Sequence, residues 1–519
     1  MDKKLRNESF LIRYALKLGG TISIALLNVL LQLFLPRALG VEQYGYYNYN
    51  LNIFTSVVLI SNLSSTSAFQ TKIAKRQNDY GLMVFYSLIY MFMFFVLNIG
   101  LSAMTVAKLI PKFFEGQSFI LVVLAMNAHL AIFLLQDIVS LYDNYLMTRT
   151  SEFMRVIQKA IIVVIVLVSF YFFQINLTQF YIVELTVIFL VVAFLAYFFS
   201  HSKKDFFRIQ GVTKGIKTYL SEFTLFCRPM VFALIYSSSI TIVSNWLLLH
   251  FSGVMEQAEY GVAWQLNSLI AYTFTPIIAL LQREFSVRVD DKAQLAHKYG
   301  QMLTITMLLV SYFACFVIVD AKSILTILFG EEYASACLVT RLIMLYTVLQ
   351  AWGQVNGALF IATERTKLYS IINIIIQTVS LGLMFVFLIP NFIWREGLGS
   401  SGIGWQILCA NVISVPILCF INCRYLGLRF LRECLSQLYT VAICLSSAFL
   451  VKVLTLLFFN IVGYSIEGII AIFVMGILYT AIIIAILMFL PKLFHIDPQI
   501  ITDMKNNIQF KYRKWKGAS

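Results

Sequence analysis

Apolar residues dominate this chain in long runs that short polar stretches separate. A helix that crosses a membrane needs about 20 mostly apolar residues, and only helices or closed barrels satisfy their backbone groups in lipid. These runs are too long and continuous for barrel strands. There are fourteen, with approximate cores at 14–35, 46–68, 82–107, 118–141, 156–173, 179–199, 223–250, 260–281, 301–319, 336–361, 368–389, 402–423, 435–459 and 469–490. The pattern predicts an all-α polytopic membrane protein with 14 transmembrane helices.

The positions of lysine and arginine predict how these helices are oriented. Cytoplasmic connections of membrane proteins carry an excess of basic residues. If the N-terminus is cytoplasmic, 32 of the 39 basic residues fall on the cytoplasmic side. The remaining seven are Arg37, Lys108, Lys112, Lys322, Arg341, Arg395 and Lys452. We therefore expect a multi-pass protein with both termini in the cytoplasm.

Composition narrows the classes of function. With 60% hydrophobic and 12% charged residues the chain is not a soluble globular protein, and membrane topology explains its net charge of +14 without nucleic acid. Its eight cysteines form no CxxC pair, so we expect no metal site and no disulfide framework. We find no nucleotide-binding or catalytic motif and only short outer connections, the longest about 320–335. The expectation is transport without an enzymatic step or a cofactor, and a membrane-bound polysaccharide polymerase is a distant alternative.

The chain also repeats itself. Tyr44-Gly45 recurs as Tyr260-Gly261 and Arg149-Thr150 as Arg365-Thr366, both 216 residues later and at equivalent places between the runs. Each half holds an even number of runs, so the two halves enter the membrane in the same orientation and form parallel repeats. We expect six-helix lobes at 1–200 and 223–423, a basic cytoplasmic linker at 201–222, two additional helices within 424–490 and a basic cytoplasmic tail at 491–519. The spaced apolar residues of the linker suggest an amphipathic surface helix.

Four segments carry a resemblance to a known family. They are RALGVEQYGYYNYNLNIFTSVVLISNLSSTSAFQTKIAKR at 37–76, FGEEYASA at 329–336, LFIATERTKLYSIIN at 359–373 and LIPNFIWREGLGSSGIGW at 388–405. They resemble the polysaccharide-transporter branch, with its Wzx-type flippases, of the multidrug/oligosaccharidyl-lipid/polysaccharide (MOP) exporter superfamily. The resemblance implies a two-lobed, MATE-like fold with a central cavity lined by the first, second, seventh and eighth runs. It also implies the bacterial cytoplasmic (inner) membrane as the location.

Polar residues form stripes along the same four runs. At helical spacing they share one face in each run. They are Lys17, Thr21, Asn28 and Gln32 in the first, Asn48, Asn52, Thr55, Asn62 and Thr66 in the second, Ser237, Thr241, Ser244 and Asn245 in the seventh, and Gln265, Ser268, Tyr272 and Thr275 in the eighth. Polar groups in lipid are costly, so these faces point either at neighbouring helices, as hydrogen bonds between spans, or into a wet cavity. An uncharged hydroxyl- and amide-rich lining would suit a sugar chain.

A pyrophosphate group needs cations. Arg13 and Arg228 stand at nearly equivalent places at the cytoplasmic starts of the first and seventh runs, and Lys17 lies one turn beyond Arg13. Arginine offers a fork of donors to phosphate oxygens, and lysine offers a mobile point charge. We predict these three as headgroup ligands. The alternative is that they are ordinary flanking charges of membrane helices.

Three ionisable residues lie elsewhere within the runs and are candidates for coupling to H⁺ or Na⁺. Asp137 is the first choice, followed by His129 in the same run and Glu184 in the sixth. Asp137 and His129 are eight residues apart, too far for a direct bond. Each could instead be a satisfied packing or interfacial residue.

The resemblance implies a flippase that moves undecaprenyl-pyrophosphate-linked oligosaccharide repeat units to the outer leaflet by alternating access, for O-antigen, capsule or exopolysaccharide assembly. Its partners would be this polyprenyl-linked oligosaccharide, membrane lipids and polysaccharide assembly proteins. A cation-coupled multidrug exporter and a lipid II flippase stay open as alternatives. The carboxylate expected of a multidrug exporter in the first run is missing from this sequence.

Overall fold

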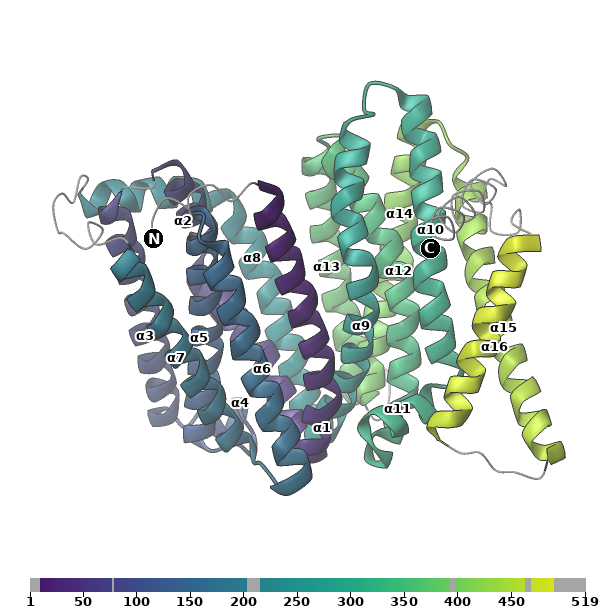
Figure 1. Cartoon of the computed structure of the whole chain (residues 1–519), viewed down its shortest axis with the longest axis horizontal. Helices are drawn as coiled ribbons and strands as arrows, with labels where there is room; N and C mark the ends of the chain where they lie inside the picture. Colours follow the sequence, from purple (N-terminus) through teal and green to yellow (C-terminus); the bar gives the residue numbers. More distant parts are fainter. Residues whose placement is uncertain (1–9, 77–78, 203–214, 393–396, 463–467, 490–519) are drawn as a thin grey trace, which may run out of the picture. The chain divides into compact units, whose positions relative to one another are not determined.

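The computed structural model describes residues 10–76, 79–202, 215–392, 397–462 and 468–489. All regular structure in these ranges is helical (Figure 1). Within the described ranges, thirteen helices are long and apolar enough to cross a membrane. The prediction of an all-α, multi-pass membrane protein is confirmed.

The first two predicted spans account for the difference between thirteen and fourteen. Both lie in α1 (Phe10–Asn62), one 53-residue element that is interrupted at Gly40, where φ is 76°. Glycine adopts this left-handed conformation at little cost because it has no Cβ. The apolar part of α1, Gly19–Asn62, has 44 residues, about twice the length of one crossing. Thus α1 supplies both predicted spans.

Contacts divide the chain into two compact units, Met1–Gly261 and Val262–Ser519. Besides α1, the first unit contains α2 (Ser65–Lys75), α3 (Tyr80–Val106), α4 (Ile110–Phe113), α5 (Phe119–Asn144), α6 (Thr148–Phe172), α7 (Leu177–Ser202) and α8 (Ile216–Ser252). Within it, α1 packs against α6 and α8, and α5 packs against α7 and α3.

The second predicted span ends earlier than the sequence suggested. Leu63 and Ser64 have positive φ values of 49° and 63°, so α1 stops at Asn62 and the chain turns before α2 begins. Thr66 therefore lies on α2, and the prediction of one continuous polar helical face from Asn48 to Thr66 is wrong. Asn62 and Thr66 hydrogen-bond to each other across the break.

In the second unit, α9 (Val254–Ser286), which begins in the first unit, is followed by α10 (Lys292–Val319), α11 (Ala321–Phe329), η3 (Glu331–Ala336), α12 (Cys337–Ala362), α13 (Thr366–Leu388), α14 (Gly399–Leu426), α15 (Phe430–Val462) and α16 (Ile469–Phe489). Here α12 packs against α14 and α10, and α15 packs against both α10 and α16. The predicted lobes follow the sequence repeat, and the contacts divide the chain within α9 instead. Residues 203–214 of the predicted linker and the tail from 490 lie outside the described residues.

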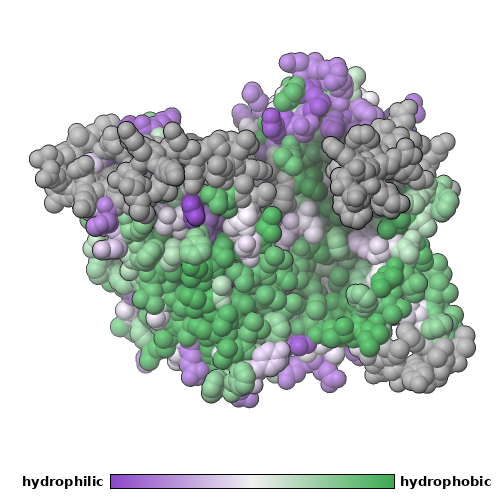
Figure 2. Space-filling model, in the orientation of Figure 1, coloured by the Kyte–Doolittle hydropathy of each residue, from purple (hydrophilic) through white to green (hydrophobic). Residues whose placement is uncertain are grey.

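The surface of the helices is apolar where lipid would contact it. Figure 2 shows hydrophobic residues along the middle of the helices and hydrophilic residues gathered near their ends. Large exposed side chains such as Phe92, Phe194 and Phe473 belong to this surface. The distribution is typical of helices that cross a bilayer.

Candidate functional site

A cavity of about 430 Å³ lies within the first unit, between the second half of α1 and α8. Its wall is formed by Leu51, Asn52, Thr55, Ser56, Leu59, Ser237, Ser238 and Thr241. These residues carry hydroxyl, amide and aliphatic groups and no charge. Hydroxyl and amide groups both donate and accept hydrogen bonds, so this wall suits a neutral ligand rich in hydroxyl groups. The second and seventh predicted runs therefore share a polar cavity.

An amide network adjoins this cavity through Asn52. Asn52 Nδ2 donates to Asn245 Oδ1 at 3.1 Å, and Gln257 Nε2 donates to the same oxygen at 2.7 Å. Asn48 Nδ2 donates to the backbone carbonyl of Gln257 at 3.0 Å. Asn48, Asn245 and Gln257 are buried, so they hold helices together in this structure. Only Asn52 belongs to both the network and the cavity wall.

The predicted headgroup residues have different surroundings. Lys17 hydrogen-bonds to Asp143 of α5 and lies 3.7 Å from Glu152 of α6, so its charge is compensated in this structure. Arg228 is exposed on α8. The side chain of Arg13 lies outside the described residues, although its backbone belongs to α1. Of the two cations with described side chains, Arg228 is the better placed to meet a phosphate.

The other predicted lining residues are not among the residues that form the cavity wall. Asn28 and Gln32 are half-buried on the first half of α1. On α9, in the second unit, Gln265 is buried, Ser268 donates to the Trp264 carbonyl at 3.0 Å, and Tyr272 is 40% exposed. The binding role of these five residues stays a prediction.

Asp137 is the centre of a second polar site. Its Oδ2 accepts hydrogen bonds from Tyr86 Oη at 2.5 Å, Tyr90 Oη at 2.6 Å and Thr66 Oγ1 at 3.2 Å. The two tyrosines come from α3 and the threonine from α2. Asp137 also lines a cavity of about 260 Å³ between these helices. Asn62 belongs to this site and not to the α1–α8 cavity, because its Nδ2 donates to Thr66 Oγ1 at 3.0 Å.

The other two coupling candidates lie apart from Asp137. His129 is buried, with Nδ1 2.8 Å from the Ala125 carbonyl one turn back on α5, so it is at least partly satisfied by its own helix. Glu184 is buried on α7 and interacts electrostatically with Lys159 of α6. Of the three candidates, Asp137 is the one that lines the cavity beside α3, and the coupling role of all three stays a prediction.

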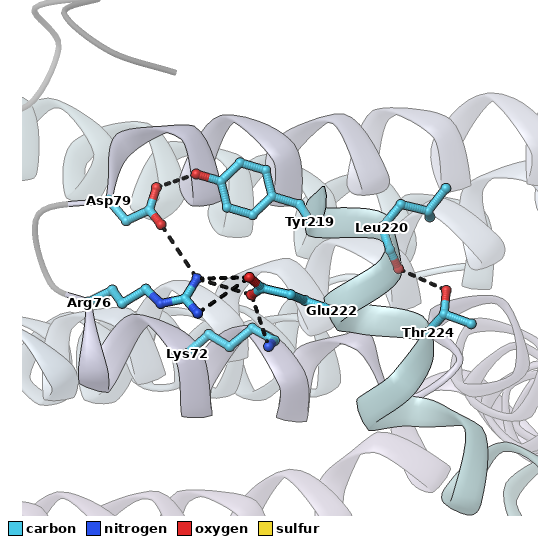
Figure 3. A network of polar contacts seen from close by, with 7 residues as sticks. All are labelled: Lys72, Arg76, Asp79, Tyr219, Leu220, Glu222 and Thr224. Carbon is cyan, nitrogen blue, oxygen red and sulfur yellow. Dashed lines mark hydrogen bonds and ion pairs between the residues drawn. The ribbon is translucent and has the colours of Figure 1, made fainter. Parts of the chain in front are cut away.

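A cluster of ion pairs ties α2 to the beginning of α8 (Figure 3). Glu222 of α8 accepts from Lys72 Nζ at 3.2 Å and from Arg76 Nη1 at 3.0 Å. Asp79, which caps the first turn of α3 by accepting from the Leu82 amide, also accepts from Tyr219 Oη of α8 at 2.5 Å. Glu222 and Lys72 are 21% and 16% exposed, so these pairs are screened less than surface pairs.

The second unit has a polar cluster between the corresponding helices. Tyr299 Oη of α10 donates to Asn356 Oδ1 of α12 at 2.9 Å. Asn422 Nδ2 of α14 donates to the same oxygen at 2.9 Å, and Arg365 Nη2 donates to Asn422 Oδ1 at 2.7 Å. The guanidinium of Arg365 also lies 4.0 Å from the centre of the Tyr425 ring. The buried acceptor in this cluster is an amide where the first unit has a carboxylate.

Several residues of these sites were not predicted from the sequence. Tyr86 and Tyr90 stand four residues apart on α3, so the pattern places them on one face but does not say which helix they meet. Gln257 joins the amide network from the first turn of α9, outside the predicted core of its run. Ser56 and Ser238 stand directly beside Thr55 and Ser237 in the sequence but were not part of the predicted polar stripes.

No protein-family model and no curated protein sequence matches the chain. Solved structures do match it. The lipid II flippase MurJ in an inward closed conformation has a TM-score of 0.65 at 13% identity, and the match covers 92% of this chain and 99% of that one.

Two multidrug transporters of the MATE family of the MOP superfamily are also similar. The inward-facing one has a TM-score of 0.63 at 13% identity and covers 78% of this chain and 95% of its own. The outward-facing one has a TM-score of 0.52 at 14% identity, with coverages of 82% and 97%. At such identities the similarity establishes the fold and leaves the substrate open. The chain has the fold shared by these MOP superfamily transporters.

Proposed function

We propose that this chain is a flippase that moves a polyprenyl-pyrophosphate-linked oligosaccharide from the cytoplasmic to the outer leaflet of a bacterial cytoplasmic membrane. The observation that carries the proposal is the α1–α8 cavity, whose wall offers hydroxyl and amide groups without a charged side chain. Sugars bind through many neutral hydrogen bonds, and such a wall can exchange partners as the sugar chain moves. The fold shared with transporters and a lipid flippase agrees with this function.

Arg228 would hold the pyrophosphate at the predicted cytoplasmic end. It is exposed and lies nine residues before Ser237 on the same helix, about 13 Å along the helix axis. This separation lets an exposed headgroup stay at the membrane surface while the first sugars enter the cavity. Lys17 would join only after releasing Asp143, because the two are paired in this structure.

Complementation of a strain that lacks its polysaccharide flippase tests the proposal. Arg228→Gln should reduce surface glycan several-fold at normal membrane abundance, and Arg228→Lys should restore part of it, because lysine keeps the charge without the fork. The matched control is Arg424→Gln, an exposed arginine near the end of α14. Ser238→Leu should also reduce export by filling the cavity wall, whereas Ser446→Leu, an exposed serine of α15, should not. Normal export by both Arg228→Gln and Ser238→Leu would contradict the proposal.

A lipid II flippase is the second candidate. It is favoured by the MurJ match, which extends over 92% of this chain. Lipid II is also a polyprenyl-pyrophosphate-linked saccharide, so the same cavity chemistry would apply. Growth of a strain depleted of its own lipid II flippase would select this candidate, and export of a longer glycan without such growth would select the first.

A further inference from the structure

The three donors to Asp137 converge on a single oxygen. Tyr86, Tyr90 and Thr66 all bond to Oδ2, and no described residue donates to Oδ1. Because the side chain lines the cavity of about 260 Å³ beside α3, water in that cavity can bring a proton to Oδ1 without first displacing a donor from Oδ2. The oxygen that can take the proton is therefore not the oxygen that accepts the three hydrogen bonds.

Three basic residues on the helices around Asp137 interact with other carboxylates. Lys72 of α2 pairs with Glu222, and Lys17 of α1 pairs with Asp143. Lys159 of α6 interacts with Glu184 of α7, and α3 contributes only the two tyrosine hydroxyls. Among the described residues, none forms an ion pair with Asp137. Its charge is therefore stabilised by neutral donors alone, and a proton can neutralise it without leaving a basic partner unpaired.

The hydroxyl of Thr66 would respond to that proton. It has one hydrogen and three acceptors in reach, namely Asp137 Oδ2 at 3.2 Å, Tyr86 Oη at 2.9 Å and Asn62 Oδ1 at 3.3 Å. A charged carboxylate is the strongest of these acceptors, and a neutral carboxylic acid is not. Protonation would therefore let Thr66 turn to its other acceptors and weaken the bond between α2 and α5.

The α2 helix connects this site to α8. Thr66 stands in its first turn, and Lys72 stands near its end and binds Glu222 (Figure 3). The turn before it holds Leu63 and Ser64 at positive φ, a conformation that strains residues other than glycine. A strained turn relaxes when the contacts that hold it weaken, so a change at Thr66 can reach the helix that lines the α1–α8 cavity.

We propose that Asp137 is a proton-binding site whose protonation loosens the α1–α2 turn and, through α2 and its ion pairs with Glu222, changes the position of α8. The inference rests on the proposed function, because proton binding would be the event that opens or closes the substrate cavity. The binding of the proton itself involves only residues of this chain and needs no substrate. The ligand is H⁺ rather than Na⁺. A sodium ion needs several oxygen lone pairs directed at it, whereas the three hydroxyl groups around Asp137 direct their hydrogens at Oδ2.

Carbodiimide labelling of the purified, full-length protein tests the site without a substrate. Dicyclohexylcarbodiimide modifies protonated carboxyl groups in apolar surroundings, and peptide mass spectrometry locates the adduct. Labelling at Asp137 should decrease as the pH rises and should not change when Na⁺ replaces K⁺. Protection by Na⁺ or labelling that does not depend on pH would overturn the proposal. These outcomes do not depend on which lipid the protein moves.

Hydrogen exchange at one fixed pH tests the connection to α2 and α8. Asp137→Asn imitates the neutral acid, and it should raise amide exchange in 65–75 and in the first turns of α8 roughly tenfold. Thr66→Val removes the α2 hydroxyl, with its bonds to Asp137, Tyr86 and Asn62, and keeps the carboxylate. It should do the same, which covers the case that Asp137→Asn folds poorly. Glu184→Gln neutralises another buried carboxylate of the same unit and should leave both segments unchanged. Unchanged exchange in Thr66→Val would contradict the link.

Discussion

The first and second units each contain a buried polar cluster in which a tyrosine donates to an acceptor on a neighbouring helix, and the two acceptors differ in kind. Tyr86 stands twenty residues before the end of α3 at Val106, and Tyr299 stands twenty before the end of α10 at Val319. Each tyrosine donates to a buried acceptor, to Asp137 on α5 or to Asn356 on α12. A carboxylate can gain or lose a charge, whereas an amide cannot.

The surroundings of the two acceptors, Asn356 and Asp137, also differ. Asn356 accepts from Tyr299 and Asn422, and Arg365 completes the network through Asn422. Asp137 faces a cavity and has only hydroxyl donors among the described residues. The second cluster is therefore suited to stabilise one arrangement of its helices, and the first is suited to switch between two. The chemical kind of the buried acceptor therefore decides which of the two clusters can respond to protons.

Replacing Asp137 by asparagine should make the first cluster resemble the second and should have the largest effect. We expect transport to fall at least about tenfold, and the remaining activity to lose its dependence on pH, because the site can no longer exchange a proton. Glycan export by complemented cells at several external pH values, normalised to membrane abundance, measures this. Glu331→Gln, an exposed residue of η3, is the control. A pH profile that keeps its shape in Asp137→Asn would break the comparison.

Removing Asn356 should instead affect stability. Asn356→Leu leaves Tyr299 and Asn422 without their shared acceptor in a buried site, which should cost about 3 kcal/mol of unfolding free energy. The pH dependence of transport should stay as in the wild type. Asn411→Leu, which loses only a bond to the carbonyl one turn back on α14, should cost less than about 1 kcal/mol. Thermal unfolding in detergent ranks the two variants, and equal losses would mean that the Asn356 cluster adds nothing.

The two tyrosines compare a charged acceptor with a neutral one directly. Tyr86→Phe should cost about 2 kcal/mol and Tyr299→Phe about 1 kcal/mol, because hydrogen bonds to charged groups are stronger. Phenylalanine keeps the stacking of Tyr86 on Phe69, so the difference reports the hydroxyl. Denaturant unfolding of both variants, with the exposed Tyr171→Phe as control, provides the values. A larger loss for Tyr299→Phe would indicate that Asp137 is neutral in the resting protein.

Exchanging Arg365 for lysine should have the smallest effect. Lysine keeps the charge but loses the Nη2 bond to Asn422 and the planar contact with Tyr425, which together should lower the unfolding free energy by about 1 kcal/mol or less. The melting temperature measures the change. Arg365→Lys also tests whether the second cluster takes part in the response to protons. Glycan export by this variant should keep its pH dependence if the cluster is only structural.

Sequence reasoning identified two helices that share a cavity but not which of their residues meet. The stripes on the second and seventh runs do meet at a cavity, as Thr55 and Thr241 show. Asn48 and Asn245 share the same stripes, yet they are buried in hydrogen bonds between helices. A polar helical face in lipid can either line a cavity or form hydrogen bonds between helices, and only the side chains of the neighbouring helix decide which of the two occurs. Likewise, the basic flank of the first run gave no sign that Lys17 would pair with Asp143.

The sequence by itself determined the class of this protein. Runs of about 20 apolar residues must become helices in a bilayer, because each residue's backbone partner lies four positions away along the chain. Local chemistry also set helix ends such as the Asp79 cap of α3. Tertiary structure decided the rest. It placed the turn at Leu63 and Ser64, where α1 ends. It also brought three hydroxyls to Asp137 and two basic residues to Glu222, which joins residues up to 150 positions apart. Such contacts arise only when whole helices pack, so no local pattern specifies them.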